Sequence, residues 1–332
     1  MATMLAMLVV LGAAAGTSGA SSVARPAKPH ILFIVSDDLR PTLGSYGTQA
    51  ITPNVDALAK RGLTFTRAYT QFPWCSPTRQ SFMTGRRPST TKAWTFTTSF
   101  RDSMPDAISL PQHFRRQGWW AASVGKLYHG RNCVRGDPGC CPAGQPTPHP
   151  TPANSTEVIC VQQPPDADFP LSWDERPVDF ARVGCHGPNQ TFESLNWCEN
   201  SAPESDYCDY KVAAGAVARL RAHAARDTDK PIFLGVGFRD DHLPWASPAR
   251  WRALFDPAKV KATAHGAPPD FSPGQVPKQA WQFPSWVGPE YNLSDTKWLQ
   301  PPQLQEALRS YMGNIAFVRP QHPPSADPCP AC

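Results

Sequence analysis

Cys75 is the residue whose chemistry most needs an explanation, because it opens a Cys-x-Pro-x-Arg pattern that ends at Arg79. Ser76 can act as an N-cap and Pro77 is preset for the first helical position, so the sequence predicts a short helix over residues 77–84. Cys75 would then lie just ahead of a helix N-terminus, where outward N–H groups and the helix dipole favour an anion. The pattern therefore predicts a binding position for an anionic ester beside Cys75. The alternative is a buried thiol or half of a disulfide.

Two adjacent carboxylates, Asp37 and Asp38, directly follow the apolar run at residues 30–35. Such a run is typical of a strand buried on both faces of a parallel sheet, and the carboxyl ends of these strands form the binding edge. Neighbouring acids repel unless something compensates, and a hard divalent cation with oxygen ligands is the usual solution. A solvated Asp-Asp turn is the alternative interpretation of an isolated pair.

A lysine and two histidines follow two further apolar runs. Lys126 and His129 come after residues 119–124, and His242 comes after residues 231–237. Because parallel strands end at a common edge, we expect these side chains to lie near the same edge as the acidic pair. A lone lysine or histidine on a loop is usually only solvated, so the pattern alone leaves both readings open.

The elements that must position these residues alternate between strands and helices. The predicted strands cover residues 30–35, 63–69, 119–124 and 231–237, and the predicted helices cover residues 53–61, 77–84, 109–116, 209–225, 247–255 and 303–317. Capping residues, first-turn prolines and closing glycines mark several of the helices. This β-α-β alternation predicts an α/β fold with a mostly parallel central sheet flanked by helices.

The composition is that of a folded protein. The chain has 332 residues, is 41% hydrophobic and carries a formal net charge of +5, with 38 prolines that cluster in long loops. It can bury a substantial core in one large domain or two smaller ones. No dense basic run is present, so we expect no nucleic-acid partner, and the mild positive bias suits an anionic small molecule or a sulfated glycan.

The first residues predict entry into the secretory pathway. Residues 4–16 are apolar and small, and we interpret residues 1–24 as a signal peptide; no stretch is long enough for a membrane span. Sequons begin at Asn154, Asn189 and Asn292. Ten cysteines in this setting predict disulfides, and if Cys75 is modified the remaining nine leave one unpaired.

The chain resembles the sulfatase family over residues 29–317. Four blocks carry this resemblance, at residues 34–44, 75–79, 84–88 and 123–126, and they are most similar to the iduronate-2-sulfatase branch. The resemblance implies an alkaline-phosphatase-like fold and one incomplete N-terminal catalytic domain. Residues 318–332 form an unrelated tail without a counterpart in the family, so we expect a C-terminally truncated or divergent product.

In this family the motif cysteine is oxidised during secretion to formylglycine, whose hydrate is the nucleophile. The resemblance therefore implies that a formylglycine-generating enzyme converts Cys75. It also implies that one Ca²⁺ ion is held by Asp37, Asp38 and residue 75. The substrate class so implied is a sulfated carbohydrate, cleaved by sulfate ester hydrolysis.

The same resemblance assigns roles to the remaining candidate residues. Arg79, Lys126 and His129 would hold the sulfate and the formylglycine hydroxyls. His242 would protonate the leaving oxygen, a role suited to the intrinsic pKa of histidine. Cys185 and Cys198 stand where the iduronate-2-sulfatase branch has a disulfide.

Two departures from the family pattern leave alternatives open. Residues 240–241 are both aspartate where the family often has Lys-Pro, and the Asp-His pair and second lysine expected after residue 317 are missing from this sequence. A catalytically inactive sulfatase-like secreted protein is therefore one alternative. A phosphodiesterase of the wider alkaline-phosphatase-like group is another.

Overall fold

The computed structural model describes residues 6–10, 28–96, 98–129, 148–149, 159–160, 165–180, 183, 197–260 and 301–317. The chain forms two compact units, each assembled from separate stretches of sequence. The first unit comprises residues 1–40, 67–181 and 208–239, and the second comprises residues 41–66, 182–207 and 240–332. The predicted extent of a single catalytic domain, residues 29–317, stays a prediction.

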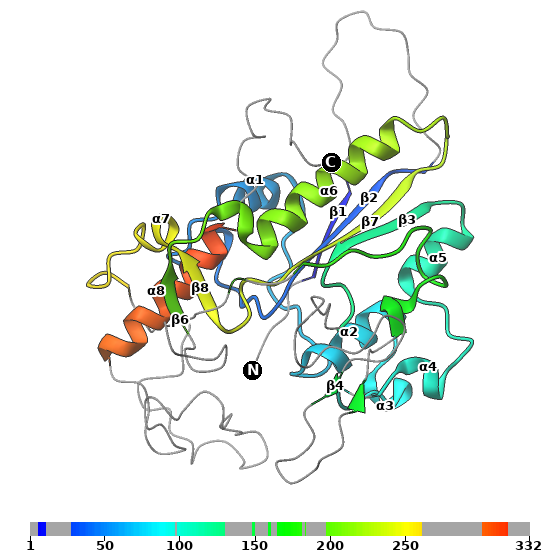
Figure 1. Ribbon diagram of the computed structural model, residues 1–332, viewed down its shortest axis with the longest axis horizontal. Coiled ribbons are helices and arrows are strands. Elements are labelled where there is room, and N and C mark those ends of the chain that lie inside the picture. Colours follow the sequence, from blue (N-terminus) through cyan, green and yellow to red (C-terminus); the bar gives the residue numbers. More distant parts are fainter. Residues whose placement is uncertain are drawn as a thin grey trace, which may run out of the picture. The chain divides into compact units, whose positions relative to one another are not determined.

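A four-stranded sheet forms the centre of the first unit (Figure 1). Its strands are β1 (Ala6–Val10), β2 (Ile31–Ser36), β7 (Ile232–Phe238) and β3 (Trp120–Gly125), in the spatial order β1-β2-β7-β3. The strands β2, β7 and β3 are parallel, and β1 pairs antiparallel with β2. The predicted mostly parallel sheet is therefore confirmed. The pairing of β1 does not test the predicted signal peptide.

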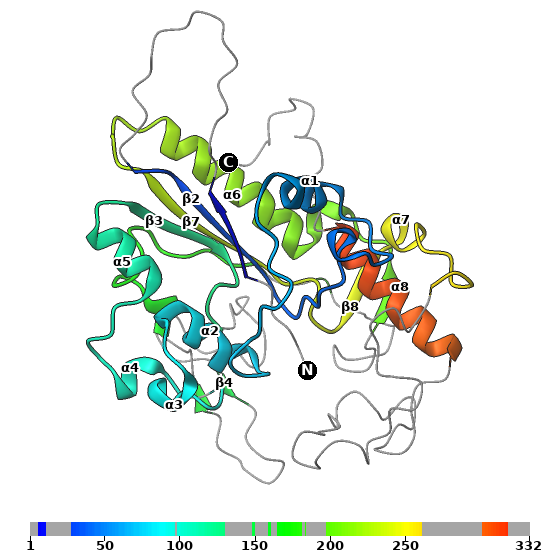
Figure 2. The ribbon, with the colours of Figure 1, turned by 180° about the vertical axis from the view of Figure 1, so that it is seen from behind.

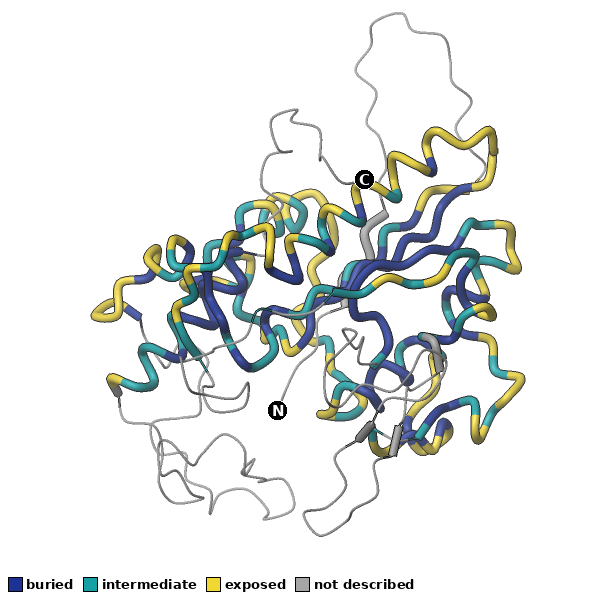
Figure 3. The backbone as a smooth tube through the Cα atoms, viewed as in Figure 1, coloured by how far each residue is buried: buried dark blue, intermediate teal, exposed yellow. Residues whose placement is uncertain are grey.

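Helices cover both faces of this sheet, as the continuous apolar runs require. On one face α2 (Cys75–Thr84) and α5 (Leu110–Arg116) pack on a core that includes Phe33, Met83 and Phe233. On the other face α6 (Cys208–Ala224) packs on a core that includes Leu234 and Val212. Figure 2 shows α6 on the opposite side of the sheet from α2 and α5, and Figure 3 shows the three parallel strands largely buried.

Smaller elements complete the first unit. They are α3 (Pro88–Thr91), α4 (Phe100–Ser103), the antiparallel pair β4 (Pro148–His149) and β5 (Ile159–Cys160), and the 3₁₀ turn η2 (Pro165–Asp168). Ser109 caps α5 in a capping box with Gln112, which confirms the predicted start of that helix.

The second unit is built around α8 (Pro301–Phe317). Its other elements are η1 (Gly44–Tyr46), α1 (Pro53–Arg61), the parallel pair β6 (Trp197–Asn200) and β8 (Trp245–Pro248), η3 (Glu204–Asp206) and α7 (Ala249–Arg252). The aromatic part of its core consists of Tyr207, Trp251, Phe255 and Phe317. Among the helices in the described ranges, none combines the length and the apolar character needed to cross a lipid bilayer.

Three sequence-based expectations about these elements were wrong in whole or in part. The helix predicted over residues 247–255 is limited to α7 (Ala249–Arg252), because residues 247–248 belong to β8. Residues 63–69 do not form a strand, and Leu63, Phe65 and Tyr69 are 75%, 65% and 69% exposed. The apolar and polar residues of this segment alternate, but no sheet lies against the segment to bury its apolar side chains. The alternation therefore does not indicate a strand here. The helical spacing of residues 213, 216, 217, 220 and 224 predicts the apolar face of α6, and this prediction is right only in part. Ala216 is buried, but Val217 is 45% exposed, and Val212, which is outside that set, is fully buried.

Candidate functional site

The carboxyl edge of the sheet brings two predicted site residues together. The Asp37 N–H donates to the carbonyl of Phe238 (3.0 Å) and the Lys126 N–H donates to that of Gly237 (2.9 Å), so both residues are fixed to the end of β7. Gly125 and Gly237 face each other across the ladder. A Cβ at Gly237 would overlap the backbone of Lys126, so this close approach requires glycine.

Cys75 is the first residue of α2 and does not lie ahead of the helix. Trp74 is the N-cap residue, and the Thr78 N–H donates to its carbonyl (3.1 Å). The predicted N-cap role of Ser76 is therefore wrong: its hydroxyl lies inside the first turn and accepts from Gln80 Nε2 (3.0 Å). Pro77 is tolerated as the third helical residue because the first N–H groups of a helix have no intrahelical partner.

A buried cluster of charges lies beneath this helix start. Arg79 Nη2 donates to Asp37 Oδ1 (2.7 Å), and the Lys126 ammonium group donates to the other oxygen of the same carboxylate. The side chains of Arg79 and Asp37 are 0% and 1% exposed. Burial is the largest single influence and acts to lower the pKa of Arg79, but its acidic neighbours, Asp37 foremost, together raise that pKa above its ordinary value.

Arg79 also binds the backbone. Its Nη1 donates to the carbonyls of Lys126 and of Leu127, the latter at 3.1 Å. One guanidinium group thus ties α2 to the carboxylate after β2 and to the chain after β3. Because this group is fully buried, we interpret Arg79 as a positioning residue for Asp37 and Lys126.

The sulfur of Cys75 lies among four charged side chains. It is 3.3 Å from Asp37 Oδ1, 3.9 Å from Asp38 Oδ1 and 3.8 Å from Lys126 Nζ. Burial raises the pKa of the thiol to about 12; Lys126 opposes this shift and the two carboxylates add to it. As an unmodified thiol, Cys75 is therefore protonated at neutral pH.

Asp38 holds its carboxylate near Cys75 through an unusual backbone. Its φ angle is 55°, in the left-handed region that non-glycine residues seldom adopt. Aspartate tolerates this region better than most residues. The two acidic side chains therefore converge on one sulfur although they are neighbours in sequence.

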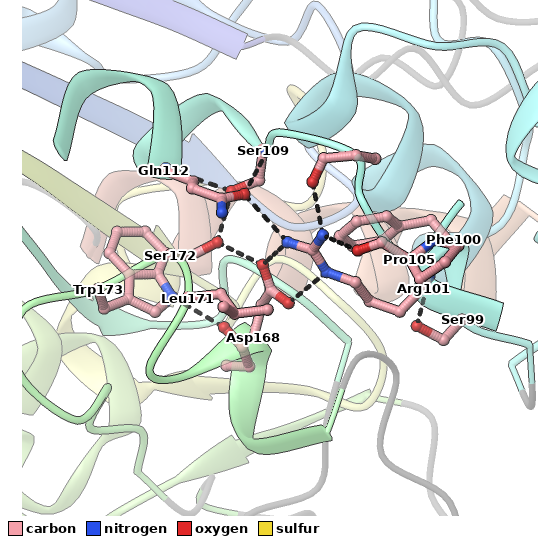
Figure 4. Close-up of polar contacts among 12 residues, drawn as sticks. Ser99, Phe100, Arg101, Pro105, Ser109, Gln112, Asp168, Leu171, Ser172 and Trp173 are labelled. Atoms are coloured by element: carbon pink, nitrogen blue, oxygen red, sulfur yellow. Dashed lines mark hydrogen bonds and ion pairs between the residues drawn. The ribbon is translucent and has the colours of Figure 1, made fainter. Parts of the chain in front are cut away.

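An ion-pair network missed from the sequence supports the loops on this side of the sheet (Figure 4). Arg101 donates to both oxygens of Asp168, with distances of 2.8 and 2.7 Å, and to Gln112 Oε1 (3.2 Å). The same carboxylate accepts from the Ser172 hydroxyl (2.5 Å), which lies 2.5 Å from that of Ser109. The sequence places Arg101 in a polar loop over residues 86–108 that could equally line a pocket or lie on the surface. Its contacts are those of a structural clamp.

This clamp reaches the candidate site through Tyr128. Its ring stacks on Phe100 at 6.3 Å between centroids, and the guanidinium group of Arg101 lies 4.6 Å from the centroid of the same Phe100 ring. Burial raises the pKa of Tyr128, and Asp168 adds to this shift. The clamp therefore stabilises the segment that follows β3 and contains Lys126.

His129 lies in the first unit, next to aromatic side chains. Its ring centroid is 4.7 Å from that of Phe96, which in turn stacks on Trp74 at 5.2 Å. These ring contacts connect His129 to the residue immediately before Cys75. Its assigned contact with a formylglycine hydroxyl stays a prediction.

His242 lies in the second unit, so its assigned role also stays a prediction. Its Nδ1 is 2.6 Å from the Leu243 carbonyl oxygen. Because a carbonyl only accepts, Nδ1 must carry the proton of this bond. Asp240 and Asp241 are 3% and 1% exposed, so the two acids that replace Lys-Pro do not face solvent.

Several predicted features lie outside the described residues. These are the three sequons, Cys185 and the tail at residues 318–332. The pairing of Cys185 with Cys198 therefore stays a prediction. Cys208 is a buried thiol in the core beneath α6, where its Sγ lies 3.3 Å from the Phe180 carbonyl oxygen.

Comparisons with known proteins agree with the geometry of the first unit. The family model described as Sulfatase matches residues 29–318. The chain is 26% identical over 317 residues to iduronate 2-sulfatase of Mus musculus, covering 88% of this chain and 50% of that protein. It is 29% identical over 254 residues to iduronate 2-sulfatase of Homo sapiens, covering 74% of this chain and 40% of that protein. The chain thus spans about half the length of these relatives, or less.

A solved structure supports the fold. The phosphonate monoester hydrolase of Agrobacterium radiobacter superposes with a TM-score of 0.54 at 20% identity, covering 86% of this chain and 56% of that one. At this identity the likeness bears on the fold alone, which is that of the alkaline-phosphatase-like sulfatases. From the extent of the family match, the chain belongs to the sulfatase family.

Proposed function

We propose that this protein hydrolyses sulfate esters of a sulfated sugar, with Cys75 converted to formylglycine and one Ca²⁺ ion bound beside it. The observation that carries the proposal is the convergence of Asp37, Asp38 and Lys126 on the sulfur of Cys75 at the start of a helix. The iduronate 2-sulfatase relatives favour a 2-sulfated uronic acid or a related polysaccharide unit as the substrate.

The side chains around Cys75 suit both the modification and the ion. Carboxylate oxygens of Asp37 and Asp38 are the hard donors that Ca²⁺ prefers, whereas a thiol is not, so a calcium site here calls for an oxygen at residue 75. Formylglycine supplies such an oxygen, and its hydrate supplies a hydroxyl that can attack sulfur. Asp37, Asp38 and residue 75 would hold the ion, which supplies positive charge next to the ester.

The chain's own residues then have distinct tasks. Lys126 lies within 3.8 Å of the reacting position and would hold a sulfate oxygen. Arg79 keeps Asp37 and the Lys126 backbone in place. His242, as an imidazolium, would give its Nε2 proton to the departing sugar oxygen. Across the whole reaction, water adds across the S–O bond, and the products are the free alcohol and sulfate.

A second candidate is a sulfatase-like protein without turnover. Both oxygens of Asp37 are already engaged by Arg79 and Lys126, which competes with binding of a cation. Calcium titration of the purified chain separates the two candidates, because a catalytic site requires saturable binding and a non-catalytic one does not.

The proposal includes maturation in the secretory pathway by a formylglycine-generating enzyme. The experiment that tests the proposal examines this maturation step. The full chain is secreted from a host that contains this enzyme, and the peptide with residue 75 is analysed by mass spectrometry. We expect a peptide in which the thiol has been replaced by an aldehyde, and hydrolysis of an aryl sulfate.

The matched controls are Cys75→Ala, which should abolish hydrolysis, and Cys208→Ala, which removes another buried thiol and should retain it. An unmodified Cys75 in secreted protein, or hydrolysis of an aryl phosphate but not of the sulfate, would reject the proposal.

A further inference from the structure

A continuous set of aromatic rings borders the candidate nucleophile. Trp74 stacks on Phe96 with centroids 5.2 Å apart and an interplanar angle of 9°, and Phe96 contacts the His129 ring at 4.7 Å. Phe72 meets Trp74 edge-on at 6.2 Å and Trp94 at 5.8 Å. We call Phe72, Trp74, Trp94 and Phe96 the aromatic row. All of them belong to the first unit.

The outer members of this row are not core residues. Trp74 and Trp94 are 42% and 44% exposed, whereas the nearby Met83 and Phe100 are fully buried. A single exposed tryptophan is ordinary, but two exposed indoles joined by ring contacts make a contiguous apolar surface. An indole also has an N–H group at its edge, so such a surface offers both an apolar face and a hydrogen-bond donor.

The position of the row limits what it can bind. Trp74 is the N-cap residue of α2 and immediately precedes Cys75. In a sulfate ester, one oxygen alone separates the sulfur from the alcohol, so the first ring of that alcohol must lie beside the nucleophile. The aromatic row begins at Trp74, the residue next to the nucleophile in sequence, and extends from Trp74 through ring contacts.

We propose that the aromatic row binds the pyranose ring of a sulfated saccharide by stacking. A pyranose has C–H faces that pack on indole and hydroxyl groups at its rim that accept from an indole N–H. This inference rests on the proposed function, and it adds the side chains that recognise the sugar. Trp94 is the member of the row whose substitution is the most selective test. Its ring contacts Phe72 and does not belong to the stack that ends at His129.

The test measures binding without turnover. The full chain carrying Cys75→Ser, which keeps an oxygen at residue 75 for calcium but lacks the second hydroxyl of the formylglycine hydrate, is titrated by calorimetry in calcium with three probes. The probes are a 2-sulfated uronic acid disaccharide, 4-nitrophenyl sulfate and inorganic sulfate. Trp94→Ala and Trp94→Phe are compared in this background. Tyr210→Ala is the matched control, because Tyr210 is 41% exposed and lies on α6.

We expect Trp94→Ala to raise the Kd of the disaccharide about 3- to 10-fold, the range that aromatic contacts provide. The Kd of inorganic sulfate, which has no ring to stack, should change less than about twofold. The aryl sulfate has a ring but no sugar hydroxyls, so its Kd should rise less than that of the disaccharide, and Trp94→Phe should restore most of the loss. Thermal unfolding of each variant checks that the fold is intact.

The proposal is overturned if the disaccharide Kd in Trp94→Ala matches that of the Tyr210→Ala control, if all three probes lose affinity equally, or if the parent background binds no disaccharide. Hydrolysis is measured separately with Cys75 intact. If the chain hydrolyses sulfate esters but Trp94→Ala leaves the Kd of the disaccharide unchanged, only the role of the aromatic row is rejected. If Trp94→Ala weakens disaccharide binding but the chain with Cys75 intact hydrolyses no sulfate ester, only the proposed function is rejected.

Discussion

Replacement of Arg79 by methionine should destabilise the first unit strongly. The substitution keeps an unbranched apolar stem but removes the ion pair with Asp37 and the bonds to the Lys126 and Leu127 carbonyls. Removing one partner of a buried ion pair costs about 3–5 kcal/mol, because the other charge stays buried without full compensation. Lys126 still contacts the carboxylate, so we expect a loss of about 3–4 kcal/mol in the free energy of unfolding. That is a large fraction of the roughly 5–15 kcal/mol that stabilises a typical domain.

Urea unfolding followed by tryptophan fluorescence measures this loss, and hydrogen exchange of the amides of Asp37 and Lys126 locates it at the sheet edge. Arg87→Met is the control, because Arg87 is exposed, lies in the same unit and should change stability by less than about 0.5 kcal/mol. If the two variants differ by less than about 1 kcal/mol, the buried cluster does not hold the site together and our interpretation of Arg79 is wrong.

Three further pairs of substitutions test the support of the site. Asp38→Asn should keep the free energy of unfolding within about 0.5 kcal/mol, while Asp38→Val should lower it by about 1–2 kcal/mol because a β-branched residue is strained at φ 55°; urea unfolding distinguishes them. Gly237→Ala should displace the Lys126 backbone, cost about 1–3 kcal/mol and abolish hydrolysis, whereas Gly47→Ala, with no atom near the added Cβ, should retain activity in an aryl sulfate assay. Arg101→Met and Asp168→Asn should each cost about 3 kcal/mol, and a double-mutant cycle should show losses that are far from additive.

The strands and the edge they share could be predicted because their signals are local. Residues 30–35, 119–124 and 231–237 are continuous apolar runs bounded by polar residues, and each forms a parallel strand within one residue of the expected bounds. Since parallel strands end at one edge, the proximity of Asp37 and Lys126 followed from the fold class alone.

The start of α2 was harder to predict because two compatible arrangements exist. Ser76 and Pro77 suit an N-cap and a first position, but both are also tolerated inside a first turn, where donors lack intrahelical partners. The choice is made by residues distant in sequence, because Arg79 must reach Asp37 and the chain after β3.

The contacts that form the clamp and the aromatic row could not be predicted from the sequence, although Arg101 and Trp94 lie in a loop that could have lined a pocket. Arg101 and Asp168 are 67 positions apart, and no local pattern links an arginine to an acid at that distance. Trp74 and Phe96, whose rings stack, are also distant in sequence, 22 positions apart (96 − 74). Contacts of this sort depend on how loops pack, which composition and periodicity do not encode.

The balance of charge around Cys75 leads to a last prediction, on calcium removal. Asp37 and Asp38 contribute two negative charges and Arg79 and Lys126 two positive ones, so these four side chains have no net charge to attract an anion. A bound divalent cation would make the site positive, and charges about 4 Å apart near a protein surface interact by roughly 4 kcal/mol. We therefore expect EGTA to weaken binding of inorganic sulfate at least about tenfold in a Cys75→Ser chain, which keeps an oxygen at residue 75 for the ion. By linkage, sulfate must tighten calcium binding by the same factor. Calorimetric titrations in both orders measure the two factors, and equal sulfate affinity with and without calcium would show that the four side chains bind the anion unaided.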